Sequence, residues 1–295
     1  MQIQYTTLTI PITLTKKAAF SQPVPFIFRS ILGFNLRKLV CVAKSAECKN
    51  CLYKESCVYS LAFDEAEIHP TILTAEPFFN EKTLIENVEL SIIFLGKFAK
   101  YADYYLQALK RGAKSGILRE RIPYKIEIEQ CKIENGNWNV ELCSSNFVSQ
   151  PQTFKFELLT PFRFKAMGKY NLQFTELDFI LCLHRRCQKL CSLYGKNNFK
   201  DKYFFENKWK IIERDLKWQK LERWSSRQKQ VMPLGGIIGD LTLQGEFTEY
   251  ELALFQFARL FNVGKNTNFG MGNLNIQKPP LSCYSIAFME SNLEK

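Results

Sequence analysis

Histidine and long apolar runs are both scarce in this sequence. The 295 residues include only two histidines, His69 and His184, so imidazole acid–base chemistry has two candidate groups. The longest apolar run, residues 90–95, is too short to span a bilayer. Residues 1–7 lack the basic and apolar regions of a secretory signal. We therefore expect a cytoplasmic protein with no membrane partner.

Complete nucleotide-binding motifs are missing from the glycine-rich segment at residues 262–272. A P-loop would need a glycine and a hydroxyl residue where Arg259 and Asn266 stand. A dinucleotide fingerprint would need a third glycine in place of Asn275. The segment's three glycines, its lysine and its side-chain amides still suit a phosphate chain, because they combine close backbone approach with hydrogen-bond donors. An ordinary glycine-rich hairpin is the alternative.

Positive charge and aromatic rings are abundant. The chain carries 40 lysines and arginines against 29 acids, for a formal charge of +11 and a pI near 9.1. Aromatic residues make up 14% of the sequence, which provides rings for a core and for stacking on bases. This composition excludes a disordered chain and favours a polyanionic partner, which could be DNA, RNA or an anionic membrane.

Cysteines cluster near the N-terminus. Four of the ten cysteines fall within seventeen residues, among charged side chains that are typical of a solvated loop. They are Cys41, Cys48, Cys51 and Cys57. Four thiolates can complete a tetrahedral site, so this segment predicts a structural zinc ion. Free thiols are the main alternative, and an iron–sulfur cluster is another.

The first half of the chain predicts strands and helices in alternation. Residues 3–14 alternate as a half-buried strand, and Ile27, Ile31 and Phe34 indicate the apolar face of a helix. A strand at 84–95 and a helix at 97–110 follow. Asn135-Gly136 then predicts a tight β-hairpin. The polar residues 144–152 are the best linker, so we expect domains at 1–148 and 149–295, with the cysteine-rich loop (41–57) inserted in the first.

The second half repeats the pattern. A strand at 154–159 precedes a helix at 177–194 that Thr175 caps, and Thr248 with Glu251 predicts a capping box for a later helix. On the helix at 177–194, the apolar stripe includes Cys187, and Cys191 lies one turn further on; both are interpreted as packing residues. His184 lies near the stripe and is interpreted as a satisfied core histidine.

Basic residues of the second half divide into two groups. Arg185, Arg186 and Lys189 are expected on the polar side of the helix at 177–194. Residues 208–229 interleave three tryptophans with eight lysines and arginines. This second segment predicts either a nucleic-acid surface or an exposed strand pair with half-buried tryptophans.

Four segments in this order resemble the CRISPR-associated endoribonucleases of the RAMP superfamily, which process precursor repeat RNA. They read FRSILGFNLR at 28–37 with the cysteine cluster ending at Cys57, TPFRFK at 160–165, RWSSR at 223–227 followed by two glycines at 235–236, and VGKNTNFGMG at 263–272. The resemblance implies an α+β fold of two tandem ferredoxin-like (RRM-like) domains with antiparallel sheets. It also implies CRISPR repeat RNA as substrate and other CRISPR effector subunits as further partners.

The family chemistry would cut RNA without a metal, using the ribose 2′-hydroxyl to leave 2′,3′-cyclic phosphate and 5′-hydroxyl ends. The catalytic candidates are His69 as acid or base, Arg37 as stabiliser of phosphorane charge, and Tyr59 as acid or positioning group. A non-catalytic RAMP-type subunit that holds the guide RNA is the alternative. The predicted RNA contacts are Gly264, Lys265, Asn266, Thr267, Asn268, Gly270, Gly272, Arg29, Arg223, Arg227 and Lys229.

Overall fold

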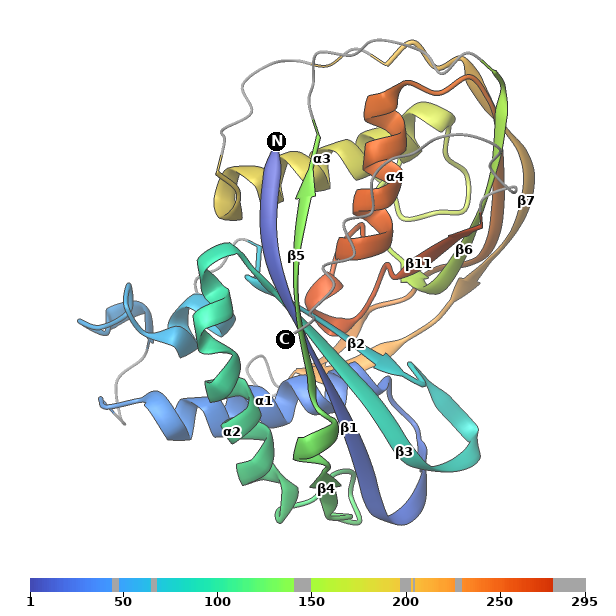
Figure 1. Ribbon diagram of the computed structural model, residues 1–295. Helices are drawn as coiled ribbons and strands as arrows, with labels where there is room; N and C mark the ends of the chain where they lie inside the picture. The colour runs from blue at the N-terminus through green and yellow to red at the C-terminus, as the bar shows by residue number, and fades with distance from the viewer. Residues whose placement is uncertain are drawn as a thin grey trace.

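A computed structural model describes residues 1–43, 48–64, 68–140, 150–196, 203, 205–225 and 230–277. Figure 1 shows two lobes, each with helices packed beside an antiparallel sheet. The predicted boundary between residues 148 and 149 lies outside the described residues, and so do Arg227 and Lys229. Within the described residues, none of the helices combines the length and the apolar composition needed to cross a bilayer.

The first domain is organised around one long central strand. Its sheet has the order β2-β3-β1-β4, and β5 also pairs with β1. The alternation of buried Leu8, Ile10, Ile12 and Leu14 in β1 confirms the predicted half-buried strand. The elements are β1 (Gln2–Phe20), α1 (Val24–Val40), β2 (Thr71–Glu76), β3 (Asn80–Leu95), α2 (Ala102–Ala113), β4 (Tyr124–Ile126) and β5 (Lys132–Asn139).

Three local predictions for this domain were wrong or incomplete. Phe34 is 61% exposed, because the buried face of α1 is formed by Phe28, Leu32 and Leu36 instead. The predicted helix at 97–110 begins as a 3-10 turn (Gly96–Tyr101) and becomes α-helical only from Ala102. Strand β2 was not predicted at all.

Asn135-Gly136 forms no hairpin turn. Both residues lie inside β5, where Asn135 pairs with Thr6 and Gly136 with Tyr5 of β1. A Cβ on Gly136 would stand 2.2 Å from a ring atom of Tyr5, so the glycine is needed for a close cross-strand approach. The dipeptide therefore reflects packing against β1 and not a change of chain direction.

The second domain repeats the ferredoxin-like arrangement. Its sheet has the order β11-β6-β10-β7, so strands far apart in the sequence are neighbours. The predicted N-cap Thr175 of α3 and the predicted capping box of Thr248 and Glu251 at the start of α4 are confirmed, and Asp178 completes a capping box with Thr175. The elements are β6 (Gln152–Phe162), α3 (Glu176–Tyr194), β7 (Trp209–Gln219), β8 (Glu222–Ser225), β9 (Gln230–Pro233), β10 (Gly236–Gly245), α4 (Glu249–Phe261) and β11 (Leu274–Gln277).

The tryptophan-rich segment forms strands, as one of its two interpretations expected. Trp209 in β7 is only 1% exposed, and its indole N–H donates to Glu251 at 2.9 Å. This ring therefore belongs to the core and cannot stack on a base. Strands β8 and β9 pair as a separate two-stranded hairpin that carries Arg223.

The two domains share an apolar contact. Trp138 of β5 packs edge-on against Phe257 of α4, with ring centroids 5.2 Å apart, and Tyr5 of β1 contacts Phe261 at 5.1 Å. Figure 1 shows α3 and α4 between the second sheet and the upper ends of β1 and β5. Burying these rings fixes the domains against each other.

Candidate active site

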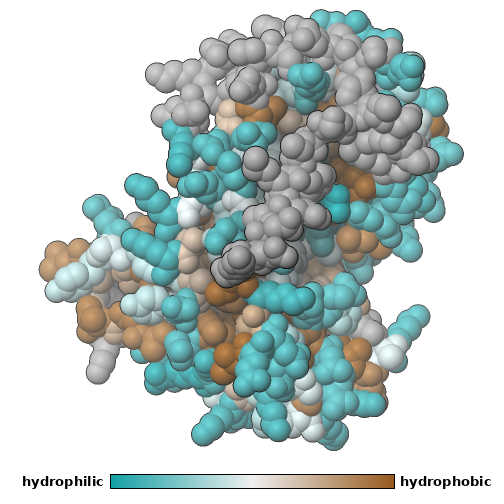
Figure 2. Space-filling view, in the orientation of Figure 1, coloured by the Kyte–Doolittle hydropathy of each residue, from teal (hydrophilic) through white to brown (hydrophobic). Residues whose placement is uncertain are grey.

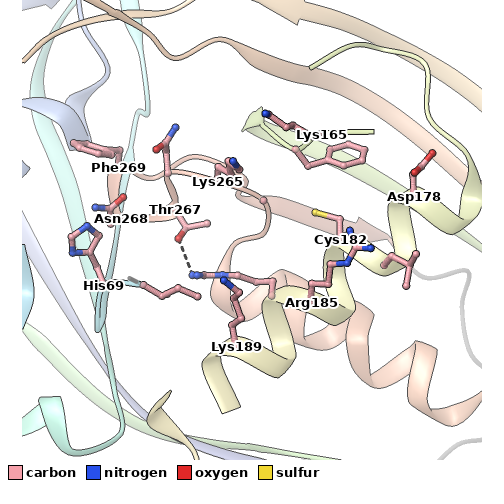
Figure 3. A pocket seen from close by; sticks show the side chains of 16 residues that line it. His69, Lys165, Asp178, Cys182, Arg185, Lys189, Lys265, Thr267, Asn268 and Phe269 are labelled. Carbon is pink, nitrogen blue, oxygen red and sulfur yellow. Dashed lines mark hydrogen bonds between the residues drawn. The ribbon is translucent and has the colours of Figure 1, made fainter. Parts of the chain in front are cut away.

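A cavity of about 560 Å³ lies between the two domains beside the glycine-rich segment. Figure 3 shows His69 and the glycine-rich segment on one side and the basic side chains of α3 on the other. The first domain contributes Ile68 and His69. The second contributes Phe164, Lys165, Asp178, Leu181, Cys182, Arg185, Arg186, Lys189 and residues 264–269.

The cavity is strongly cationic. Five of its lining residues are lysine or arginine, and Asp178 is the one carboxylate among the lining residues. An Asp178 oxygen already accepts hydrogen bonds from the backbone N–H and hydroxyl of Thr175 at the start of α3. The cavity thus offers excess positive charge to an anionic ligand.

The glycine-rich segment needs its glycines. Gly264, Gly270 and Gly272 have φ of +82°, +76° and +72°, a region that other residues rarely adopt. A Cβ on Gly264 would stand 2.6 Å from the carbonyl oxygen of Arg163, and one on Gly272 would stand 1.8 Å from that of Val263. These close approaches are made to the protein's own backbone, and the predicted approach to a ligand stays a prediction.

Arg186 of α3 supports the glycine-rich segment with side-chain hydrogen bonds. Its Nη2 donates to the Thr267 hydroxyl at 2.8 Å and its Nε to the Asn262 carbonyl at 3.4 Å. Burial lowers the pKa of the guanidinium to about 10. We expected Arg186 on the polar side of α3, and that was wrong. The signal was present, because Arg186 lies three residues after buried Leu183 and four before buried Leu190.

Arg29 of α1 supports the same segment from the first domain. Its guanidinium lies over the rings of Phe63 and Phe269, at 4.5 and 4.7 Å from their centroids. With the Asn268 amide assigned so that its oxygen faces Arg29, that oxygen accepts from Nη2 at 2.9 Å and from Nε at 3.1 Å. Burial, and then the charge of Arg223, lowers the pKa of Arg29 to about 10.

His69 is placed by a backbone contact. Its Nδ1 lies 2.7 Å from the Ala62 carbonyl, which can only accept, so Nδ1 carries the proton. Its Nε2 then keeps a lone pair, and this nitrogen lies 3.5 Å from Arg29 Nη2. The Asn268 oxygen lies 2.9 Å from Nε2 and accepts a hydrogen bond from it only when Nε2 is also protonated, as in the imidazolium. Burial, and then the charge of Arg29, lowers the pKa of His69 to about 4. The imidazole is therefore neutral at neutral pH.

The other two catalytic candidates lie elsewhere. Arg37 and Tyr59 line a separate cavity of about 400 Å³, with the guanidinium 5.7 Å from the tyrosine ring centroid. Tyr59 stacks on Phe63 at 5.4 Å, and the Phe63 ring is the one that Arg29 covers. The structure thus connects Arg37 and Tyr59 to His69 through a stack of rings and guanidinium groups, but it does not bring them into the His69 cavity.

Among the predicted RNA contacts, the described residues 264–272 form the wall or the support of the cavity. Arg223 of the β8–β9 hairpin lies over the ring of Phe269 at 4.5 Å, beside Arg29. Thr267 and Asn268 are buried and bind protein groups. They position the segment, whereas Lys265 is exposed. Sequence reasoning missed Arg163, whose carbonyl accepts from the Lys265 backbone N–H at 2.7 Å.

The cysteine-rich segment projects from the first domain. All four of its cysteines are half-buried and form no disulfide. In the described part of the chain, no three or more potential ligands are grouped closely enough to hold a metal. The zinc ion stays a prediction that the structure does not support. Figure 2 shows hydrophobic patches on this side of the first domain, where Val42 and Leu52 are exposed.

His184 is a core residue, as interpreted. It is 6% exposed, its Nδ1 lies 2.7 Å from the Tyr250 hydroxyl, and the rings of Tyr203 and Phe205 surround it. Burial lowers its pKa to about 4. Cys187 and Cys191 are also buried, which confirms their packing role.

Two family models match the two halves of the chain. Residues 3–151, just over half of the chain, match the family AF_1859_N, described as an N-terminal domain, and belong to it. Residues 156–274, which carry α3 and the glycine-rich segment, match the CRISPR-associated endoribonuclease Cas6 family. The second half of the chain thus carries a Cas6 endoribonuclease domain, as the resemblance predicted. No curated protein matches the chain significantly.

Solved Cas6 structures share the fold. A Cas6 product complex is similar with a TM-score of 0.56 at 16% identity, over 92% of this chain and 99% of that one. A Cas6-related protein from Pyrococcus furiosus gives 0.52 at 13% identity, over 92% and 98%. A partial Cas6-RT-Cas1–Cas2 complex gives 0.55 at 14%, over 96% of this chain and 48% of that one. At these identities the likeness shows the ferredoxin-like fold, and it confirms the predicted fold class.

Proposed function

We propose that this Cas6 protein cleaves CRISPR repeat RNA at the His69 cavity, by attack of a ribose 2′-hydroxyl and without a metal. The observation that carries the proposal is a neutral imidazole, with its lone pair on Nε2, at the wall of a cavity lined by five cations. The cations suit the RNA backbone, and the imidazole suits the removal of a hydroxyl proton.

His69 would act as the base. Its Nε2 takes the proton of the 2′-hydroxyl, the 2′-oxygen forms a bond to phosphorus, and the bond from phosphorus to the 5′-oxygen breaks. The Asn268 oxygen, 2.9 Å from Nε2, would accept a hydrogen bond from the new imidazolium. A bound phosphate would also offset the charge of Arg29 and so raise the pKa of His69, which strengthens the base.

The cations would stabilise the phosphorane. Arg185, Lys189 and Lys265 enter the cavity from α3 and from the glycine-rich segment (Figure 3). Their charges act where water is partly displaced, which is where such stabilisation has its largest effect. The leaving 5′-oxygen needs a proton, and the ammonium group of Lys265 can supply it. The products would be a 2′,3′-cyclic phosphate and a 5′-hydroxyl.

The side chains lining the cavity favour a metal-independent route. Holding Mg²⁺ at the scissile phosphate takes carboxylate oxygens. Asp178 is the cavity's one carboxylate among the described residues, and its Oδ2 caps α3. Lysine and arginine instead provide the positive charge that a metal would otherwise bring.

A second candidate function is a non-catalytic subunit that holds the guide RNA. The separation of Arg37 and Tyr59 from the His69 cavity favours it, because a full acid–base set is then not assembled in one place. Binding would still use the cationic cavity. In either case other CRISPR proteins are proposed partners, since the partial Cas6-RT-Cas1–Cas2 complex contains the same fold.

One experiment separates the two functions. The protein is incubated with end-labelled repeat RNA from the neighbouring array in excess EDTA, beside a repeat with a single 2′-deoxy substitution at the cleaved position. The proposal predicts cleavage in EDTA, a 2′,3′-cyclic phosphate end, and no cutting of the deoxy substrate. Intact repeat RNA bound tightly by the protein would establish the non-catalytic subunit instead.

A further inference from the structure

A tight turn follows β6 and projects an exposed methionine. Ala166 and Lys169 exchange two backbone hydrogen bonds of 3.0 Å, and the residues between them, Met167 and Gly168, have φ of +47° and +79°. Left-handed conformations suit glycine or asparagine, and a methionine there is strained by about 1 kcal/mol. Met167 is also 80% exposed. Neither the left-handed backbone nor the exposure of the methionine stabilises the fold, which suggests a role for this side chain in binding.

Cations surround the base of this turn. Arg163 and Lys265 donate to the hydroxyl of Tyr170, and the Arg163 guanidinium lies 4.1 Å from the ring centroid. Lys165 lies 5.4 Å from the same ring, and Lys265 lies 5.8 Å from it. Burial raises the pKa of Tyr170, but the hydrogen bonds and charges of Arg163 and Lys265 outweigh it and lower the pKa overall.

These cations lack acidic partners. In the described part of the chain, no ion pair joins Arg163, Lys165, Lys169 or Lys265 to a carboxylate. The Tyr170 oxygen accepts from two cations, which leaves its own proton available for an acceptor. A group of cations around one phenol that still has a proton to donate is complementary to a phosphate oxygen.

The turn is continuous with the cavity. The Arg163 carbonyl accepts from the Lys265 backbone N–H, and Arg163 Nη1 donates to the Gly235 carbonyl at 2.8 Å. Lys165 and Lys265 line the cavity as well as approaching Tyr170. An RNA strand that leaves the cavity past Lys265 therefore meets residues 163–170 next.

We propose that residues 163–170 form a second contact for single-stranded RNA, next to the cleavage site. Lys165, Lys169 and Tyr170 bind backbone phosphates, and the Met167 side chain packs against the face of a base. The exposed apolar atoms of Met167 can pack only against the face of an unstacked base. Such faces are accessible in a single strand but are covered by stacking in a duplex. The inference rests on the proposed RNA-processing function and names the strand that flanks the scissile phosphate as the ligand.

The test measures binding of a fluorescein-labelled oligouridylate of about 12 nucleotides, a length within the usual range for single-strand sites. Met167→Asn removes the apolar tip while keeping a residue that tolerates positive φ, so the variant should fold at least as well and bind about 5-fold more weakly. The double variant Lys165→Ala/Lys169→Ala should lower the salt slope of log Kd by about 1.4, for two phosphate contacts. Lys16→Ala/Lys17→Ala on β1 removes two exposed charges elsewhere and serves as the matched control.

Two results would decide the inference separately from the function. If the wild type cleaves repeat RNA in EDTA while the turn variants bind the oligouridylate as tightly as the β1 control, the second contact is wrong and the proposed function stands. If the wild type leaves repeat RNA intact but Met167→Asn still weakens binding relative to the control, the second contact is supported and the nuclease is wrong.

Discussion

The two histidines of this chain have similar pKa values but lie in different surroundings. Each has its Nδ1 at 2.7 Å from an oxygen, and burial lowers the pKa of each to about 4. His184 is enclosed by tyrosine and phenylalanine rings inside the second domain. His69 lines an open cavity, where Arg29 and Asn268 face its Nε2.

Access to a ligand, and not the pKa, distinguishes the two histidines. A depressed pKa does not separate the two residues, because burial produces it in both. What separates them is access: a ligand entering the cavity can reach His69 and neutralise the charges beside it, whereas His184 has rings around it. An anion should therefore change the basicity of His69 and leave His184 unaffected.

The largest expected effect is on cleavage. His69→Ala should lower the single-turnover cleavage rate of repeat RNA by about 10²- to 10⁴-fold, the usual contribution of a general base, while RNA affinity changes little. His184→Ala should lower stability by creating a space among aromatic rings, yet its folded molecules should cleave at nearly the wild-type rate. Rates are measured with saturating protein, and the folded fraction by circular dichroism. Unimpaired cleavage by His69→Ala would place the base elsewhere.

The next effect is on acid stability. An unfolded histidine has a pKa near 6.5, whereas both folded ones titrate near 4. As pH falls from 6.5 to 4, the unfolded chain takes up protons that the folded protein does not, so folding becomes less favourable. The two histidines together should lower the free energy of unfolding by about 3 to 4 kcal/mol between pH 7 and pH 5.

Urea unfolding at the two pH values measures this loss, and variants divide it between the sites. His184→Phe removes one titrating group and keeps a ring, so the histidine part of the loss should be about half that of the wild type. Carboxylates contribute equally to both proteins, so the difference between the two losses isolates His184. A variant with the same pH dependence as the wild type would show that His184 titrates normally when folded.

Local signals explain which parts of the fold could be predicted. The alternation in β1, the Thr175 cap of α3 and the capping box of α4 depend on neighbours along the chain, and all three were confirmed. Asn135-Gly136 was misread because its structure depends on Tyr5, more than a hundred residues away in sequence but opposite in the sheet. Strand β2 pairs only through β3, so its place also depends on tertiary contacts.

The site divides in the same way. The glycine-rich segment and His69 were found from residue type alone. The backbone freedom of glycine and the acid–base chemistry of histidine are properties of the residue itself. Helical spacing marks Arg186 as facing inward, but its partners, and the inward role of Asn268, depend on contacts between the segment, α1 and α3. Arg163 and Tyr170 were missed as a contact surface for the same reason.

Asn268 allows a direct test of the contrast between the histidines. Asn268→Asp would put a carboxylate beside His69 Nε2 and Arg29, so it should raise the pKa of His69 by about one unit or more. His184 should keep its value, because it lies in the aromatic core. NMR titration of the two imidazoles measures both at once. The added negative charge should also weaken RNA binding by about tenfold or less. Equal movement of both resonances would mean that the variant has changed the fold.

The smallest expected effect concerns Lys265, the exposed cation of the glycine-rich segment. Lys265→Ala should weaken repeat-RNA binding a few-fold and lower the salt slope of log Kd by about 0.7, the value for one phosphate contact on a single strand. Lys210→Ala removes an exposed lysine from β7, away from the cavity lining, and should leave the slope unchanged. The two are compared by fluorescence anisotropy across a salt series. If both variants lower the slope equally, the cations that bind RNA are spread over the second domain. The cavity beside His69 would then not be the preferred RNA site.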